Sequence, residues 1–197
     1  MTESLDFPQL VPHVVVIGAS WGGIEAIIRI LRQIPDHFPA AVVIVQHRHS
    51  DAHASFDKSL RRYCTLPVRE VEDKDVLQPS HIFLAPANYH MLLERDLSFS
   101  LCLSAPVFYC RPSIDVTMQS MASVLGHALI GVLLTGANED GAEGLWSIQK
   151  QGGLTIAQDP EEAAAPAMPL SAIARGGVDK VIKLKEIIPY ILGVLGE

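Results

Sequence analysis

Val14–Gly23, VVVIGASWGG, is the stretch that decides how this chain folds. Its first four residues are β-branched, which favours an extended strand buried on both faces. The apolar residues of the next segment, Ile24–Leu31, recur at helical spacing. The sequence therefore predicts a strand that turns sharply into a helix, with Ser20 at the corner.

Gly18, Ser20 and Gly22 are spaced as in a nucleophile elbow, a strained turn that presents a serine hydroxyl beside a helix N-terminus. The short pattern is also compatible with a phosphate-binding loop or a plain tight turn. A dinucleotide-binding loop is disfavoured, because G-x-G-x-x-G needs glycine where Ser20 stands. Ser20 is thus a candidate nucleophile with two structural alternatives.

Composition narrows the class of protein. A chain of 197 residues with 49% hydrophobic residues suits one globular domain, residues 13–197, preceded by a tail or linker remnant over residues 1–12. A formal net charge of -7 disfavours nucleic-acid binding. No apolar run approaches the roughly 20 residues that span a bilayer, and the acidic N-terminus does not resemble a secretory signal. We expect a cytoplasmic protein.

Cysteine and histidine usage gives no cofactor site. The three cysteines are an odd number without a C-x-x-C pair, which favours neither disulfides nor structural zinc. His47, His49 and His53 form an H-x-H-x-x-x-H cluster, but no carboxylate or cysteine pattern completes it. We therefore expect no metal and no cofactor.

The remaining pattern predicts an α/β fold with a mostly parallel sheet and an antiparallel hairpin appended to it. Prolines at 166 and 169 favour irregular structure around residues 163–167. Strands are expected at 13–17, 41–45, 66–71 (an edge strand), 82–85, 89–94, 97–103, 129–134, 154–158 and 181–184, and helices at 24–31, 51–62, 113–125, 143–151 and 187–195.

Three predicted strands end in reactive groups, Ser20, His47 and Asp140. Because the carboxyl ends of parallel strands share one edge of a sheet, these side chains can meet. A serine hydroxyl needs a base, and an imidazole needs a carboxylate to fix its tautomer, so the set predicts a Ser-His-Asp triad. Asp115 and Asp159 compete for the acid role, but Asp140 follows the strongest central strand.

Seven blocks in order resemble the catalytic domain of the chemotaxis protein-glutamate methylesterases, the CheB family. The resemblance spans about residues 13–190. The blocks are GASxGG at 18–23, QH at 46–47, AP at 85–86 with HM at 90–91, RPSxD at 111–115, LTG at 134–136 with DGA at 140–142, AQD at 157–159 and MP at 168–169.

The resemblance implies a three-layer α/β/α, doubly wound domain that hydrolyses γ-glutamyl methyl esters on chemoreceptor signalling segments and deamidates certain receptor glutamines. Ser20 would be the nucleophile, His47 the general base and Asp140 the orienting carboxylate. The backbone N–H groups of Trp21 and Ala137 would face the oxyanion. The substrate cleft would also include Gly22, Arg111 and Asn138, although Arg111 can equally serve as a loop anchor.

Three positions depart from the family pattern. Trp21 stands where threonine is usual, Ala137 where methionine is usual and Asn138 where glycine is usual. Asparagine tolerates positive φ, and backbone donors survive side-chain changes, so we expect retained chemistry with an altered substrate preference. The alternative is a non-catalytic or nucleotide-binding Rossmann-like scaffold in a signalling complex.

Regulation is a further expectation from the resemblance. The family's N-terminal receiver domain would need more than the 12 residues before the strand at 13–17. The sequence is therefore compatible either with an excised domain or with a free-standing esterase that a separate receiver protein controls.

Overall fold

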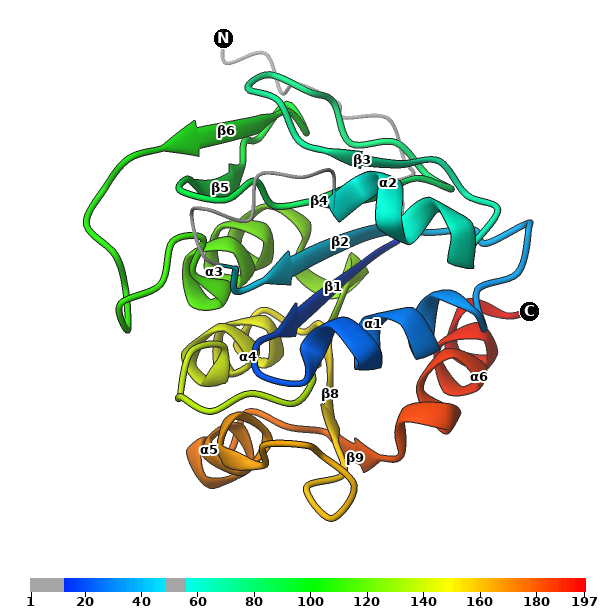
Figure 1. The fold of residues 1–197 in the computed structure, drawn as a ribbon, viewed down its shortest axis with the longest axis vertical. Coiled ribbons are helices and arrows are strands. Elements are labelled where there is room, and N and C mark those ends of the chain that lie inside the picture. Colours follow the sequence, from blue (N-terminus) through cyan, green and yellow to red (C-terminus); the bar gives the residue numbers. More distant parts are fainter. Residues whose placement is uncertain (1–12, 49–55) are drawn as a thin grey trace, which may run out of the picture.

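A seven-stranded sheet forms the centre of the computed structural model, which describes residues 13–48 and 56–197 (Figure 1). The predicted tail 1–12 lies outside the described residues. The strand order is β3-β4-β2-β1-β7-β8-β9, and every neighbouring pair is parallel. The strands are β1 (Val14–Ala19), β2 (Ala41–Gln46), β3 (Val68–Glu70), β4 (Ile82–Leu84), β7 (Leu129–Leu133), β8 (Leu154–Gln158) and β9 (Lys180–Ile182).

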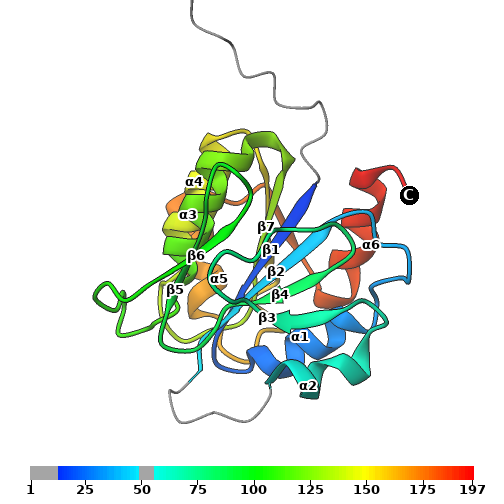
Figure 2. The same ribbon diagram turned by 90° about the horizontal axis from the view of Figure 1, so that it is seen from above.

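Helices cover both faces of this sheet, as the view from above shows (Figure 2). One face carries α1 (Gly23–Leu31), α2 (Phe56–Leu60) and α6 (Leu184–Leu195), and the other carries α3 (Ile114–Leu125), α4 (Ala142–Lys150) and α5 (Ala167–Arg175). Short 3-10 turns follow α2 at 61–63 and α3 at 126–128. The predicted three-layer α/β/α architecture is confirmed.

The valine run explains why β1 lies in the middle. Val15 and Ile17 belong to the core under α1 and α6, whereas Val14 and Val16 belong to the core under α3 and α4. All four side chains are fully buried. Because each buried branched side chain contributes about 1.5–3 kcal/mol, a strand without polar alternation is most stable between two helical layers.

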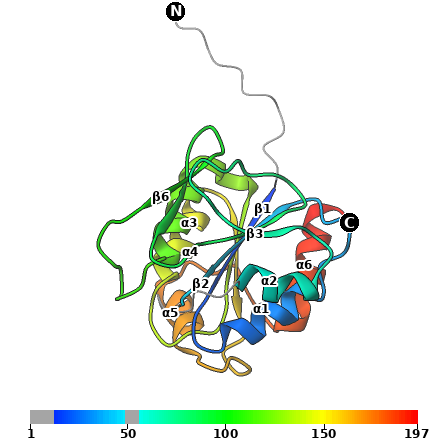
Figure 3. The same ribbon diagram turned by 45° about the horizontal axis from the view of Figure 1, so that its top comes forward.

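The predicted hairpin exists, but it does not extend the parallel sheet. Strands β5 (His90–Leu93) and β6 (Phe99–Cys102) form their own antiparallel sheet, which lies over α3 (Figure 3). Thr117 and Ser120 of α3 bind the backbone of β5 at Met91 and Leu93. The attachment predicted from sequence is wrong because β4 already has β2 on one side and β3 on the other.

Helix α5 is absent from the sequence prediction. Pro166 immediately precedes the helix and Pro169 lies in its first turn, where backbone N–H groups have no intrahelical partner. The two prolines therefore mark a helix start as well as the irregular segment before it. Of the predicted helix 51–62, residues 51–55 lie outside the described part of the chain, and the remainder forms α2 and the following 3-10 turn.

The sheet brings three loops together at the carboxyl ends of its central strands. β1 pairs with β2 on one side and with β7 on the other, so the segments that follow these strands are neighbours. No helix within residues 13–48 and 56–197 is both long and apolar enough to cross a membrane.

Candidate active site

Ser20 occupies the corner between β1 and α1. Its backbone N–H donates to the Thr135 carbonyl at 3.0 Å, and the N–H of Gly23 donates back to the Ser20 carbonyl at 2.9 Å. Gly22 has a φ of 75°, and a Cβ there would come within 2.6 Å of the Ala164 Cβ. Glycine is therefore needed both for the left-handed turn and for the close packing that holds the corner.

His47 reaches the same corner from the end of β2. In the β1–β2 register Ala19 pairs with Gln46, and the N–H of His47 donates to the Ala19 carbonyl at 3.0 Å. The Gln46 side chain also donates to the Ser20 carbonyl at 2.9 Å. The imidazole Nδ1 then lies 3.1 Å from the Ser20 Oγ.

Asp140 completes the chain of hydrogen bonds from the loop between β7 and α4. Its Oδ2 lies 2.8 Å from the Nε2 of His47. Because an ionised carboxylate only accepts, the proton of neutral His47 belongs on Nε2, which leaves Nδ1 to accept the Ser20 hydroxyl proton. This is the tautomer that a general base acting on Ser20 requires.

The N-terminus of α3 holds Asp140 in place. The fully buried carboxylate accepts from the backbone N–H groups of Ile114 and Asp115 at 2.7 and 2.9 Å, and from the Ser113 hydroxyl at 2.9 Å. Burial alone would raise the pKa of Asp140, but the bonds from His47 and the α3 backbone outweigh it and lower this pKa. Asp140 is therefore anionic and fixed before any substrate binds.

These contacts also set the charge of His47. Burial favours the neutral imidazole, yet the hydrogen bond to Asp140 and its charge, together with the nearby Cys110 side chain, outweigh burial and raise the pKa of His47 to about 9. Cys110 itself is held by the Asn138 amide, 3.6 Å from its Sγ. The sequence pattern did not connect Cys110 with His47, because 63 residues separate them along the chain.

Asp115 makes the reciprocal contact and does not touch His47. Its Oδ1 accepts from the N–H groups of Gly141 and Gly144 at the start of α4, at 2.8 and 2.7 Å. Asp140 thus binds the start of α3 while Asp115 on α3 binds the start of α4. Burial and the neighbouring Asp140 charge raise the pKa of Asp115 to about 7.

Asp159, the other competitor, turns away from the triad. Its Oδ1 accepts from the N–H of Glu161 at 3.0 Å, which closes a local turn. Of the three acids that the sequence offered, the structure brings Asp140 into contact with the imidazole.

A hollow of about 420 Å³, here called the nucleophile hollow, opens beside Ser20 and is lined by Trp21, Gly22, His47 and Ala137. The Trp21 side chain is 72% exposed at its rim. Within the described residues, the N–H groups of Trp21 and Ala137 donate to no other backbone group. Free backbone donors next to a candidate nucleophile are what stabilisation of an oxyanion requires.

Asn138 and Arg111 act differently from each other. Asn138 does not use the positive φ that asparagine tolerates, and its Oδ1 accepts from the N–H of Asp140 at 3.2 Å, which stabilises the turn. Arg111 both anchors a loop, through bonds to the carbonyls of Leu103 and Ser104, and lines a second hollow that reaches His47.

His90 is a supporting residue that the sequence pattern left without a role. It is fully buried, its Nδ1 accepts from the N–H of Ser113 at 3.1 Å and its Nε2 lies 3.1 Å from the Ala105 carbonyl. The His90 ring therefore links the segment that contains Arg111 to the start of α3. Its position in a family block was the available signal.

A metal site receives no support from the described residues. Among residues 13–48 and 56–197, no group of three or more His, Cys, Asp or Glu side chains could hold an ion. His49 and His53 of the sequence cluster lie outside this part of the chain.

Comparison with known proteins gives a family. The model of the CheB methylesterase family matches residues 15–191. A Leptospira interrogans protein, provisionally named protein-glutamate methylesterase/protein-glutamine glutaminase, is 42% identical over 173 residues, or 88% of this chain and 90% of that protein. The protein-glutamate methylesterase/protein-glutamine glutaminase of Caldanaerobacter subterraneus is 39% identical over 93% of this chain and 52% of its own length.

A solved structure agrees with these sequence matches. The crystal structure of the Thermotoga maritima CheB methylesterase catalytic domain has a TM-score of 0.89 at 31% identity, and covers 94% of this chain and 100% of that one. With the family match over residues 15–191, the chain belongs to the CheB methylesterase family.

Proposed function

We propose that this protein is a cytoplasmic serine hydrolase that removes methyl esters from glutamate side chains in the signalling segments of chemoreceptors. The observation that carries the proposal is the hydrogen-bonded series Ser20–His47–Asp140, with separations of 3.1 and 2.8 Å. Family membership supports the choice of ester and of substrate. Residues 13–197 would form the catalytic domain.

The proposed first step is attack on the ester. The Ser20 Oγ bonds to the γ-carbonyl carbon while its proton passes to the Nδ1 of His47, and Asp140 stabilises the resulting imidazolium. The carbonyl oxygen becomes an oxyanion that the N–H groups of Trp21 and Ala137 stabilise, each such donor contributing roughly 10²–10³-fold in rate. Methanol leaves with the proton that His47 returns.

The second step releases the product. His47 takes a proton from water, the hydroxide adds to the acyl carbon, and the bond to Ser20 breaks as the serine recovers its proton. The product is a free glutamate carboxylate. An amide can follow the same course with ammonia as the leaving group, so we extend the proposal to glutamine deamidation, an activity that the names of the relatives include.

Electrostatics favour the imidazolium strongly. With its pKa raised to about 9, most of His47 is protonated at pH 7 in the free protein. Turnover should therefore increase with pH until the imidazole is neutral. The same preference stabilises the imidazolium that forms during attack.

Trp21 is the residue that we propose alters substrate preference. A large exposed ring at the rim of the nucleophile hollow limits which side chains can lie beside the ester, whereas the small Ala137 leaves room on the facing loop. Trp21→Thr should therefore change the ranking of methylated receptor peptides by kcat/KM. An unchanged ranking would contradict this role.

A non-catalytic scaffold is the alternative. Both separations in the series lie within hydrogen-bond range without a ligand, which favours the hydrolase.

The test is methanol release from a methylated chemoreceptor by wild-type protein and by Ser20→Ala. Release by wild type alone supports the proposal. Equal release by both would exclude Ser20 as nucleophile, and no release by either would favour the scaffold. Ammonia release from the glutamine form of the receptor measures deamidation in the same way.

A further inference from the structure

A second hollow, of about 350 Å³, shares His47 with the nucleophile hollow. We call it the arginine hollow, because its lining includes Arg48 and Arg111 together with Asn88 and Tyr109. Among residues 13–48 and 56–197, His47 is the one residue that lines both hollows. A substrate segment with its ester at Ser20 therefore has a second place beside the same imidazole for another side chain.

The arginine hollow is positive in a negative protein. Within the described residues its charged lining consists of the two arginines, with His47 and no carboxylate, although the chain has a net charge of -7. The contrast is a hollow of similar size beside α4 and α5, which is lined by Asp115, Glu139 and Glu143 with Arg175. The positive lining is thus local to the hollow next to the triad.

The two arginines differ in how much of their charge is available. Arg48 forms an ion pair with Glu70 and also donates to the Ala85 carbonyl at 3.0 Å. Arg111 donates from Nη1 to the neutral carbonyls of Leu103 and Ser104, at 3.1 and 3.0 Å. Within the described residues no carboxylate lies within ion-pair distance of Arg111.

The bonds of Arg111 fix its position without cancelling its charge. Its Nε is buried and makes no hydrogen bond to any other described residue, and the backbone carbonyl of Arg111 accepts from the N–H of Asn88 at 3.1 Å. A guanidinium that is already oriented loses little entropy when it binds, and its remaining Nη2 group can donate a charge-assisted hydrogen bond to a carboxylate. The group that these features fit is a carboxylate.

We propose that the arginine hollow binds a free carboxylate on the same substrate segment that carries the methyl ester, with Arg111 as its principal contact. This inference rests on the proposed function. Side chains three or four residues apart on a helix lie about 5–6 Å from each other at Cβ, so neighbouring glutamates can enter neighbouring hollows. The protein would then prefer esters that have a free glutamate one helical turn away.

The direction of the preference, for a charged or for a neutral neighbouring side chain, distinguishes a specific contact from general charge repulsion. Without a specific contact, a protein of charge -7 repels an additional carboxylate and should favour the neutral substrate. With the contact, a charge-assisted hydrogen bond should favour the carboxylate about 10-fold or more in kcat/KM.

The experiment uses helical peptides that carry one γ-glutamyl methyl ester and differ at a single residue, Glu or Gln, four positions before or after the ester. The peptides are matched in helicity by circular dichroism. Methanol release at pH 8 gives the Glu/Gln ratio of kcat/KM for the full chain, at low and at high NaCl. We expect a ratio of about 10 for at least one position at low salt, decreasing as salt is added.

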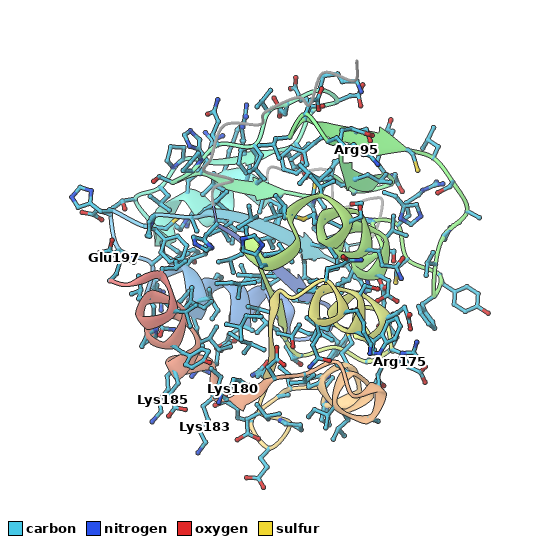
Figure 4. The ribbon with its side chains drawn as sticks, turned by 180° about the vertical axis from the view of Figure 1, so that it is seen from behind. Arg95, Arg175, Lys180, Lys183, Lys185 and Glu197 are labelled. Carbon is cyan, nitrogen blue, oxygen red and sulfur yellow. The ribbon has the colours of Figure 1, made fainter. Side chains whose placement is uncertain are left out.

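Two variants locate the preference. Arg111→Gln should bring the Glu/Gln ratio to about 1 or below, and Arg111→Lys should retain part of the preference because the charge remains. Arg95→Gln is the control for net charge, since Arg95 is exposed on the β5–β6 hairpin (Figure 4), and it should keep the wild-type ratio.

A wild-type ratio of 1 or below at both positions, or an unchanged ratio in Arg111→Gln, would overturn the proposal while leaving the esterase function intact. If wild type releases no methanol from any peptide or from a methylated receptor, the proposed function fails and the subsite with it. Should Arg111→Gln not fold, the wild-type ratio, its salt dependence and Arg111→Lys still decide.

Discussion

Replacing Asp140 with asparagine removes a buried charge while almost keeping the size of the side chain. The contacts of His47 raise its pKa from an ordinary value of 6.5 to about 9, although burial alone would lower it. This difference corresponds to about 3 kcal/mol that favours the imidazolium. Since the His47 side chain is only 9% exposed, solvent screens little of the interaction.

Because protonation of His47 is linked to folding, this interaction makes the stability of the protein depend on pH. The folded protein holds a proton on His47 that the unfolded chain releases near pH 6.5, so the stabilisation is complete below 6.5 and is lost as pH rises through about 9. We expect the wild-type free energy of unfolding to fall by about 3 kcal/mol across this range from His47 alone. Asp140→Asn should lose much less.

Two assays check this expectation. NMR titration of the His47 ring should give a pKa of about 9 in wild type and a clearly lower pKa in Asp140→Asn. Urea unfolding of both proteins at pH 6.5 and 9.5 gives the loss of stability, and groups other than those near Asp140 cancel in the comparison. Equal losses, or a His47 pKa that stays near 9 in the variant, would refute Asp140 as the source.

The remaining predictions concern catalysis, backbone and helix caps. Because the proposed mechanism uses neutral His47 as the base, kcat/KM for an ester should rise with pH toward about 9, and Cys110→Ala should move this rise to lower pH. A flat profile between pH 7 and 9 would contradict the assignment. Gly141→Ala should destabilise by about 3 kcal/mol in urea unfolding, since its φ is 101° and a Cβ would lie 2.3 Å from the Leu133 Cδ1. Gly176 also has a positive φ, 79°, but a Cβ there would meet no other atom, so Gly176→Ala should lower stability by only about 1–2 kcal/mol. Equal losses of stability in the two variants would show that the contact with Leu133 contributes nothing to the effect of Gly141→Ala. Asp115→Asn retains an oxygen for the Gly141 and Gly144 N–H groups and removes the charge facing Asp140, so the variant should be more stable than wild type at pH 8. Because the pKa of Asp115 is raised, this gain in stability should decrease below pH 7 and disappear near pH 4. A gain that does not depend on pH would contradict this explanation.

The central sheet could be predicted because its signals are local. Four consecutive β-branched residues at the start of β1 required burial on both faces, and the glycines around Ser20 required a sharp turn. The meeting of Ser20 and His47 followed from the rule that parallel strands share their carboxyl edge. Their contact depends on one register, with Ala19 opposite Gln46. The valine-rich pattern of both strands is compatible with this register but does not determine it.

Features that depend on contacts between distant residues could not be predicted. The reciprocal binding of helix starts by Asp140 and Asp115 involves N–H groups about 25 residues away along the chain, and no spacing rule encodes it. The link between Cys110 and His47 is of the same kind. Helix α5 was missed for a local reason. A proline before a helix and a proline in its first turn give the same sequence pattern as two prolines in an irregular segment.

We propose that His47 and Asp140 activate Ser20 as a nucleophile. A fluorophosphonate reagent tests it most directly, because it forms a covalent bond with an activated serine, and peptide mass mapping locates the adduct. We predict one adduct, on the peptide that contains Ser20, absent in Ser20→Ala and formed at least 10²-fold more slowly in His47→Ala. Labelling that persists in Ser20→Ala, or that proceeds equally fast in His47→Ala, would contradict the account.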